Sequence, residues 1–341
     1  MKTFKVDNRF IQNVPSTFGS RRPKLGSDQL YLPGLEPFGP FDLWATFALF
    51  SLLDQERPEE VVRTTPTELL EILEFAKVVS DALAGYETFK SKHYRMVEEA
   101  LHRLYTVQVN WRGYYNVMTG KRGRPEKRYV DYNDRILVRV GYIYPEGVTP
   151  PEQERPTKRK NVNKAMTTTG EPGPPIYKLT SGPKPEFVEF RFAPDLVKGL
   201  QGEMIGSTTI PLQFFNLRAK FQPYPLATRL LVWTLRQTAR RMTRDIDRLI
   251  NELNFKGVDA TRNRRQLLDF FTMLQEAGVV DSFHFDPTTN KVTFKKAAAW
   301  HFAKGKKAEL EEGDHGDEDQ GEADEEGVED LVFDLVEEGE A

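Results

Sequence analysis

The chain has 341 residues, long enough for two domains of about 100–150 residues each with additional tails. It contains no cysteine, which excludes disulfides, thiolate zinc sites and a cysteine nucleophile, and its five histidines are scattered, so we expect neither a metal site nor a cofactor. No segment reaches the roughly 20 apolar residues needed to span a bilayer, and residues 1–10 lack the apolar centre of a signal peptide, so we expect a cytoplasmic protein without membrane contact.

Acidic and basic residues are separated along the chain, which the net charge of −3 conceals. Of the 51 Asp and Glu, 17 lie in residues 309–341, where there is no Lys or Arg. Residues 1–308 therefore carry 48 basic and 34 acidic side chains, a net charge of +14. Such a body favours a polyanionic partner, because its cations steer the polyanion and release its counterions. The alternative is a solvated basic surface.

The first half of the chain predicts an arm followed by three helices. We expect residues 1–40, rich in Gly, Pro and Ser, to form the arm, and structure to begin at Phe41. Residues 41–53 are an apolar helix. "TPTE" (65–68) predicts the start of a second helix, because it combines a capping box with a proline at the first helical position. Residues 94–104 place Tyr, Val, Leu and Leu at helical spacing and predict the third.

Two strands are expected after these helices. "TVQVNWRG" (106–113) alternates in polarity, and "RILVRVGYIY" (135–144) is its expected partner. The proline-rich segment 145–175 cannot bury enough apolar surface to offset its ordering entropy. We expect it to be a linker or a long excursion from the first domain.

The same order of elements recurs in the second half. Residues 225–242 predict one apolar helix, and 246–253 and 267–274 predict two more with apolar residues at i, i+3, i+4 and i+7. Two strands joined across "DPTTN" (286–290) follow. Three helices and a two-stranded wing are typical of the winged helix-turn-helix unit, and two copies predict a tandem or internally duplicated protein.

The predicted fold class is therefore α+β, with tandem winged helix-turn-helix domains and a disordered acidic C-terminal tail. The expected boundaries are an arm at 1–40, a first domain at 41–215 that includes 145–175, a second domain at 216–303 and the tail at 304–341.

The third helix of the second copy carries the main candidate site, because a helix-turn-helix reads DNA with the first half of this helix. Cations at a helix N-terminus oppose the helix dipole by roughly 0.3–1 kcal/mol each, so the fold alone gains nothing from them. Contact with a phosphate or a guanine edge would make the interaction energy of these cations favourable. The alternative is a solvated basic turn. With Leu267 in the core, the outward residues are Thr261, Arg262, Arg265, Asp269 and Thr272, with Arg264 on the flank and Asn263 in the opening turn.

The first helix of the second copy adds a second set of candidate DNA contacts. Helical spacing places its arginines on one stripe, which predicts contact with phosphates. The alternative is an ordinary exposed face. The stripe consists of Arg229, Arg236 and Arg240, continued by Arg241 and Arg244, and Lys291 at the wing turn is a further candidate.

In the first copy the basic residues lie between the expected strands. "RGRP" (122–125) is the core of an AT-hook, whose arginines follow the floor of the minor groove. We expect minor-groove or phosphate contact there, and a basic hairpin tip is the alternative. The third helix of this copy has mixed outward charge, which suits protein contact as well as DNA. The candidates are Lys121, Arg122, Arg124, Lys127 and Arg128 in the basic segment and Lys92 and Arg95 on the helix.

The sequence contains no motif typical of an enzyme of DNA metabolism. It lacks the G-x-x-x-x-G-K-[ST] phosphate loop of ATPases and the paired His-x-His of rolling-circle nickases. We therefore expect a protein that is not an enzyme. The alternative is a nuclease or nickase whose acidic site is hidden among the 51 carboxylates.

Residues 41–300 resemble iteron-binding plasmid replication initiators of the two-winged-helix type. The resemblance is carried by "DLWATFALFSLL", "TPTELLEIL" and "YRMVEEALHRLYTVQV" in the first copy and by "YPLATRLLVWTLRQ" and "NRRQLLDFFTMLQEAGVV" in the second. Between the copies, "FVEFRFAPDLVKGL" and "TTIPLQFFNL" extend it. The segment 145–175 and the acidic tail depart from the family pattern.

The resemblance implies that the second domain reads double-stranded origin repeats, mainly through Arg262, Asn263 and Arg265. It implies that the first domain contacts the adjacent groove and forms homodimers that repress or inactivate. It also implies melting of an AT-rich origin without ATP hydrolysis and recruitment of the host initiator ATPase, the replicative helicase or the sliding clamp. The alternative function is a winged-helix transcriptional regulator or phage replisome organiser, which binds operators without opening them.

We consider two hypotheses for the function of the acidic tail. Its end, "VEDLVFDLVEE", alternates acids with apolar residues, as a docking peptide would, and the whole tail could instead mimic DNA and screen the basic body. If it mimics DNA, deleting residues 309–341 is expected to tighten nonspecific DNA binding, measured by fluorescence anisotropy at several salt concentrations. An unchanged affinity and salt slope would remove the DNA-mimic hypothesis.

Overall fold

The computed structural model describes one compact unit, residues 1–304, and a second unit, residues 305–341. The described residues all lie in the first unit. Among them we find no helix with the length and apolar character needed to span a bilayer. They are residues 2–7, 10–11, 38–54, 56–79, 87–118, 125–148, 179, 183–197, 200, 207–237, 239–253, 255 and 259–301.

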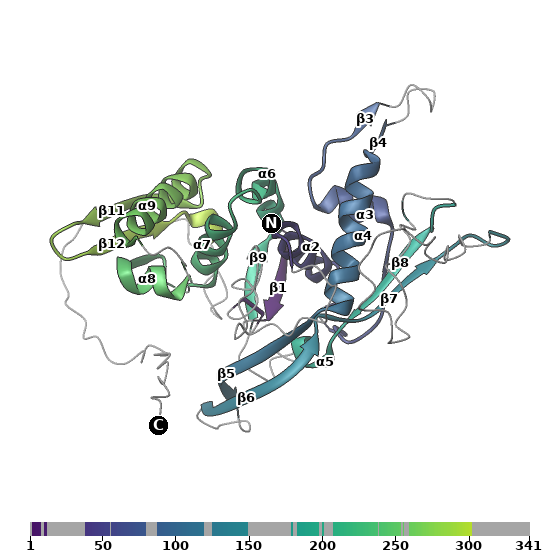
Figure 1. Ribbon diagram of the computed structural model, residues 1–341, viewed down its shortest axis with the longest axis horizontal. Helices are drawn as coiled ribbons and strands as arrows, with labels where there is room; N and C mark the ends of the chain where they lie inside the picture. Colours follow the sequence, from purple (N-terminus) through teal and green to yellow (C-terminus); the bar gives the residue numbers. More distant parts are fainter. Residues whose placement is uncertain are drawn as a thin grey trace, which may run out of the picture. The chain divides into compact units, whose positions relative to one another are not determined.

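The chain is a mixed helix-and-sheet protein in which the strands are antiparallel (Figure 1). Its elements, in chain order, are β1 (Thr3–Asp7), α2 (Pro40–Ser51), β2 (Val62–Thr64), α3 (Pro66–Ile72), β3 (Val78–Val79), β4 (Glu87–Thr88), α4 (Ser91–Thr106), β5 (Gln108–Met118), β6 (Pro125–Arg135), β7 (Leu137–Ile143), β8 (Phe187–Phe192), α5 (Pro194–Val197), β9 (Ser207–Pro211), the 3-10 helix η3 (Leu212–Leu217), α6 (Arg218–Phe221), α7 (Pro225–Arg236), β10 (Arg241–Asp245), α8 (Ile246–Glu252), α9 (Ala260–Glu276), β11 (Val280–Asp286), β12 (Lys291–Lys296) and the 3-10 helix η4 (Ala298–Trp300).

The first module, which we define as α2 to β8, packs its helices against a three-stranded sheet of order β2-β8-β7. Alternate residues of β8 point to one face, where Val188, Phe190 and Phe192 are buried. Phe192 stacks on Phe50 of α2 with ring centroids 4.3 Å apart. The helices therefore cover one face of this sheet.

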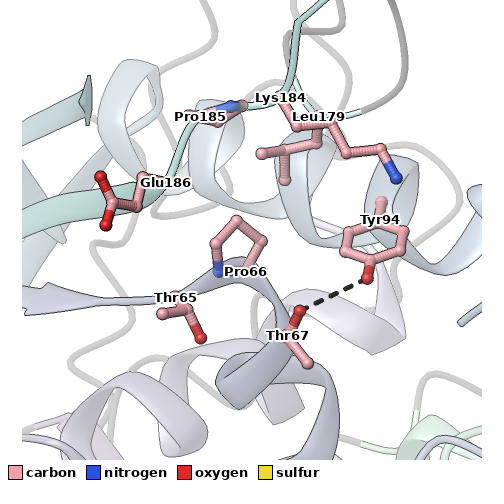
Figure 2. Close-up of a pocket in the computed structure, with 8 residues that line it drawn as sticks. All are labelled: Thr65, Pro66, Thr67, Tyr94, Leu179, Lys184, Pro185 and Glu186. Atoms are coloured by element: carbon pink, nitrogen blue, oxygen red, sulfur yellow. Dashed lines mark hydrogen bonds between the residues drawn. The ribbon is translucent and has the colours of Figure 1, made fainter. Parts of the chain in front are cut away.

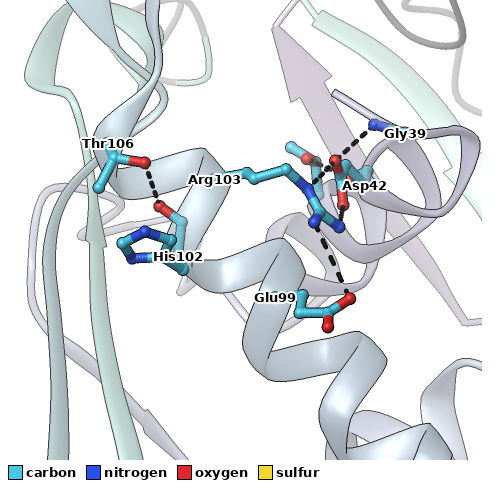
Figure 3. A network of polar contacts seen from close by, with 7 residues as sticks. Gly39, Asp42, Glu99, His102, Arg103 and Thr106 are labelled. Carbon is cyan, nitrogen blue, oxygen red and sulfur yellow. Dashed lines mark hydrogen bonds and ion pairs between the residues drawn. The ribbon is translucent and has the colours of Figure 1, made fainter. Parts of the chain in front are cut away.

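A polar contact also joins two helices of the first module (Figure 3). Arg103 of α4 donates two hydrogen bonds to the carboxylate of Asp42 in α2, at 2.7 and 2.8 Å. The backbone N–H of Gly39 donates a third to the same carboxylate at 2.7 Å. Asp42 is 0% exposed, so this ion pair lies inside the apolar core.

The second module, α7 to β12, repeats this arrangement. Its sheet has the order β10-β12-β11, so the last strand is central, as β8 is in the first module. Phe294 of β12 packs against Trp233 of α7 at 5.9 Å and against Phe271 of α9 at 5.3 Å. Once the hairpins β3–β4 and β5–β6 of the first module are set aside, both modules run helix, strand, two helices and two strands, so the order of elements recurs with insertions in the first copy. The sequence missed the short first strand of each module.

Three helix starts follow the chemistry of their capping residues. Thr65 accepts a hydrogen bond from the N–H of Glu68 at 3.0 Å, which is one half of the predicted capping box, whereas the Glu68 carboxylate accepts from the hydroxyl of Thr64 at 2.6 Å. Asp245 caps α8 and Asp259 caps α9 in the same way. All predicted core positions but one are buried, which confirms the helical periodicity: Leu69 and Leu70 in α3 with Leu73 directly after it, Tyr94, Val97, Leu101 and Leu104 in α4, Ile246, Leu249 and Ile250 in α8 with Leu253 directly after it, and Leu267, Phe270, Phe271 and Leu274 in α9. The exception is Ile72 of α3, which is half-buried.

The N-terminal residues correct one expectation. We expected structure to begin at Phe41, but β1 pairs with β9 along its whole length. Phe4 and Val6 of β1 are buried, and Phe4 stacks on Phe215 at 5.6 Å. A five-residue strand followed by a Gly- and Pro-rich stretch gives little sequence signal, so its non-local partner was missed. Residues 12–37 of the expected arm lie outside the described residues.

The strand pairing of the first module corrects another expectation. Apart from the pair Gln108–Arg135, residues 106–113 do not pair with 135–144; instead β5 and β6 form a hairpin of eleven residue pairs, and β7 pairs with β8. Only Ile136 separates β6 from β7, and no Gly or Pro signals the change of partner. Because β7 and β8 flank residues 145–175, this segment is an excursion from the first module rather than a linker between modules.

The residues between the modules pack on the first module. Phe214 stacks on Trp44 of α2 with centroids 4.5 Å apart. Arg218 places its guanidinium 3.8 Å from the centre of the Phe75 ring and donates hydrogen bonds to two backbone carbonyls at the end of α3. We expected the second domain to begin at residue 216, and this packing extends past that boundary.

A buried lysine at the end of the central strand of the second module bonds to the backbone just after α7. Lys296 at the end of β12 is 1% exposed, and its ammonium donates a hydrogen bond to the carbonyl of Gln237 just after α7. Burial lowers the pKa of Lys296 to about 8.

The pKa of Lys296 predicts a pH-dependent stability. The folded pKa lies below the value of about 10.4 for an unfolded chain, so between these values the unfolded state binds more protons and stability rises with pH. We expect the unfolding free energy to rise by up to about 3 kcal/mol from pH 8 to pH 10.4, measured by urea unfolding, and Lys296→Met to abolish this rise. Lys295→Met, at the exposed neighbouring position, is the control. A rise that survives in Lys296→Met would contradict the assignment.

Candidate nucleic-acid interface

The first two turns of α9 present two arginines to solvent. Arg262 and Arg265 are exposed, and neither forms an ion pair with another described residue. The outward positions Thr261, Asp269 and Thr272 are exposed as predicted. The carboxylate of Asp259 accepts the N–H of Arg262 at 3.1 Å, so the local acid caps the backbone. Arg262 and Arg265 thus lie in the N-terminal part of a seventeen-residue helix, the end that carries the positive pole of the helix dipole.

The third arginine of these two turns is held by the protein itself. Arg264 donates from Nε to Asp247 of α8 at 2.7 Å and makes a second hydrogen bond from its terminal nitrogen to the other carboxylate oxygen. Asn290, in the turn between β11 and β12, donates to the same carboxylate at 2.9 Å. The bond from Arg264 lowers the pKa of Asp247 and raises that of the guanidinium. We infer that Arg264 fixes α9 relative to α8 and the hairpin turn.

Asn263 is not available for base reading in this structure. We expected it in the opening turn facing the ligand, but it is 7% exposed. The reason is helical geometry: residue 263 lies one turn before Leu267 and shares its core-facing side.

The predicted arginine stripe does not form on one helix, because α7 ends at Arg236 and the backbone is extended at Gln237. Arg229 is 8% exposed and donates to the carbonyl of Leu253 at 3.2 Å, which satisfies the C-terminal end of α8. Burial lowers the pKa of Arg229 to about 10 and also lowers that of Arg236, which is half-buried. We assign both side chains to the packing of the module.

The remaining predicted candidates of the second module lie on or beside its sheet. Arg240, just before β10, donates to the carbonyl of Lys296 at 3.3 Å and lies 3.5 Å from Asp281. Arg241 is exposed on β10, whereas Arg244 is half-buried and donates to a neighbouring carbonyl. Lys291 is exposed at the start of β12.

The candidates of the first module are only partly described. Lys92 and Arg95 are exposed on α4, and Arg95 pairs with Glu99 at 2.9 Å, so its charge is locally balanced. Lys127 and Arg128 belong to β6, whose backbone alone is described there. Lys121, Arg122 and Arg124, with the AT-hook match, lie outside the described residues, as does the acidic tail.

Comparison with models of protein families gives no match, and comparison with curated proteins gives none either. Similar solved structures include a selenomethionine crystal structure of domains 2 and 3 of RctB, with a TM-score of 0.47, 11% identity, and coverage of 85% of this chain and 99% of that one. Another RctB domains 2–3 structure has a TM-score of 0.42, 10% identity and coverage of 84% and 97%. The Pi initiator protein in complex with iteron DNA has a TM-score of 0.43, 12% identity and coverage of 87% and 98%. These TM-scores decide neither fold nor function.

A cavity of about 380 Å³ in the first module is a separate candidate (Figure 2). Tyr94 and Pro66 line it, and the ammonium of Lys184 lies 5.1 Å from the centre of the Tyr94 ring. Glu186 lies at the other end of the lining in Figure 2, away from Lys184. This arrangement does not pair a base with a nucleophile, so we assign the cavity no catalytic role.

Sequence reasoning overlooked the outward residues of the second sheet. Lys295 and Thr293 alternate with the buried Val292 and Phe294, so "KVTFKK" carried the signal. The pairing of these residues with Arg241 and Thr243 of β10 joins parts of the chain about fifty residues apart, and periodicity within one strand cannot reveal it.

Proposed function

We propose that this protein is a sequence-specific double-stranded DNA-binding initiator of replication and that both modules are winged helix-turn-helix units. The observation that carries the proposal is the exposed pair Arg262 and Arg265 in the first two turns of α9. These cations oppose the helix dipole and have no acidic partner among the described residues. A DNA phosphate or a guanine edge supplies the missing negative charge.

The architecture of the second module supports this proposal. The third helix of a helix-turn-helix enters the major groove with its N-terminal residues, and a wing contacts the neighbouring backbone. Asp247 links α9 to the β11–β12 turn through Arg264 and Asn290. A fixed spacing between helix and wing suits recognition of a duplex, because both contact surfaces then meet the DNA in one register.

The proposal includes the finer points that the family resemblance implies. Origin repeats are the ligand, an AT-rich segment melts beside them without ATP hydrolysis, and host replication proteins are recruited. The protein has no catalytic activity of its own in this scheme, and the first module forms a homodimer in one of its states.

The proposal is tested on supercoiled DNA carrying the region around the gene. An initiator protects direct repeats from nuclease and makes an adjacent AT-rich stretch reactive to permanganate. Protection without permanganate reactivity would indicate a transcriptional regulator, and metal-dependent strand cutting would indicate a nuclease. Either result would contradict the initiator function.

A further inference from the structure

The sheet of the second module has an outer face that points away from the helices. Its other face carries Phe294, which packs against α7 and α9. Residues alternate between the two faces of a strand. The outer face therefore presents three cross-strand rows, Arg241–Lys295–Ser282, Thr243–Thr293–His284 and Asp245–Lys291–Asp286.

One end of the outer face carries two cations side by side. Arg241 and Lys295 are exposed and are direct cross-strand partners, and like charges in this position destabilise a sheet. Neither forms an ion pair within the part of the chain that the structure describes. Nearby acids have other contacts: Asp281 lies 3.5 Å from Arg240, and Asp286 accepts hydrogen bonds from its own turn. The fold by itself therefore does not account for this pair.

The corresponding sheet of the first module has the opposite electrostatic arrangement. Glu189 of the central strand β8 accepts hydrogen bonds from Arg63 of β2 and Arg139 of β7, each at 2.8 Å. The bond from Arg63 is the largest cause that lowers the pKa of Glu189. Glu189 lies between two buried residues of β8, as Thr293 lies between two buried residues of β12. The same topological position thus holds a carboxylate in one module and a hydroxyl in the other.

We propose that the outer face around Arg241 and Lys295 binds the phosphate backbone of double-stranded DNA, as a contact surface separate from the first two turns of α9. This inference rests on the proposed DNA-binding function. Arg and Lys provide the charge, and the hydroxyls of Ser282 and Thr293 add neutral donors of the kind that contact DNA backbones. A phosphate placed between the two cations turns their mutual repulsion into attraction.

The side chains of this face favour a duplex over unpaired bases. The phenylalanines of the sheet, Phe283, Phe285 and Phe294, belong to the apolar core, so they do not offer rings on which single-stranded bases stack. Phosphate contacts carry no sequence information. The outer face therefore raises affinity for cognate and random duplexes alike, and its contribution falls as salt rises.

Thr293→Glu tests the proposal in the full chain, because it places the first module's carboxylate at the matching position, diagonal to Arg241. Thr293→Gln is the matched control, since it also removes the hydroxyl contact with Thr243 but adds no charge. The probe is a random-sequence duplex of about 30 base pairs, roughly three helical turns, titrated at several salt concentrations. Relative to Thr293→Gln, we expect Thr293→Glu to bind on the order of tenfold more weakly at 0.1 M salt, with a salt slope smaller by about 1–2.

The thermal midpoint provides the second readout. Because the new carboxylate relieves the repulsion between Arg241 and Lys295, Thr293→Glu should melt no lower than Thr293→Gln. Equal DNA affinity for these two variants would overturn the outer-face inference and leave the α9 site untouched, provided that Arg262→Ala still weakens binding. A wild-type protein that binds no duplex would overturn the proposed function and the inference together.

Discussion

Replacing Arg262 and Arg265 by alanine is expected to weaken binding at the cognate site by about 1–3 kcal/mol each, roughly a 5- to 150-fold loss per residue. The physical reason is that each arginine is exposed, lacks an acidic partner among the described residues, and under the proposed function belongs to the part of α9 that would meet a base edge. Because both side chains oppose the helix dipole, their removal should leave the thermal midpoint unchanged or slightly higher.

The measurement is a competition binding assay at fixed salt with cognate and random duplexes. Arg57→Ala, a change at an exposed loop arginine, controls for lost charge alone. An equal loss of affinity for both duplexes would mean that the two arginines contact phosphates and do not read bases. Arg264→Ala should also weaken binding, although its guanidinium is held by Asp247, because α9 then loses its fixed position relative to the hairpin.

The helices of both modules could be predicted because their evidence is local. The spacing of Leu267, Phe270, Phe271 and Leu274 defines the core side of α9, and all four are buried. The same spacing predicted that Arg262 and the other outward residues face solvent. It failed at Asn263, because a residue in the first turn can share the core side with a residue four positions later.

The errors of prediction concern chain breaks and distant pairing. Residues 237–240 contain neither Gly nor Pro, so nothing in the sequence marks the end of α7, and five arginines were predicted to form one stripe although they belong to a helix, a bend and a strand. Strand β8 pairs with β7 across a long insertion, and β1 pairs with β9 across about two hundred residues. A single sequence contains no signal for such partners.

The contrast between the two sheets shows that strand pairing decides whether the charge of a side chain is balanced. Charge along one strand is balanced or unbalanced only once its neighbours are known, and the neighbours of Glu189 and Lys295 come from distant segments. The net charge of +14 for residues 1–308 says that cations are in excess. For the described residues, the structure shows which cations form ion pairs within the chain and which do not.

Arg103→Met is expected to lower the unfolding free energy by about 3–5 kcal/mol, because it leaves the carboxylate of Asp42 inside the core with its charge uncompensated. The N–H of Gly39 still donates to that carboxylate, but one neutral donor does not offset the lost ion pair. Urea unfolding followed by circular dichroism measures the change. Arg95→Met is the matched control on the same helix, where an exposed pair with Glu99 contributes about 0.3–0.5 kcal/mol.

A second replacement separates the ion pair from the packing around it. In Asp42→Leu with Arg103→Met, both charges are gone, so we expect the double variant to recover part of the stability that Arg103→Met alone loses. A double variant at least as unstable as the single one would show that the side-chain volumes, not the unpaired charge, dominate the cost. Since α9 lies in the other module, Arg103→Met should still bind DNA through Arg262 and Arg265 at temperatures well below its midpoint. Loss of binding under those conditions would instead show that recognition by α9 depends on the packing between α2 and α4.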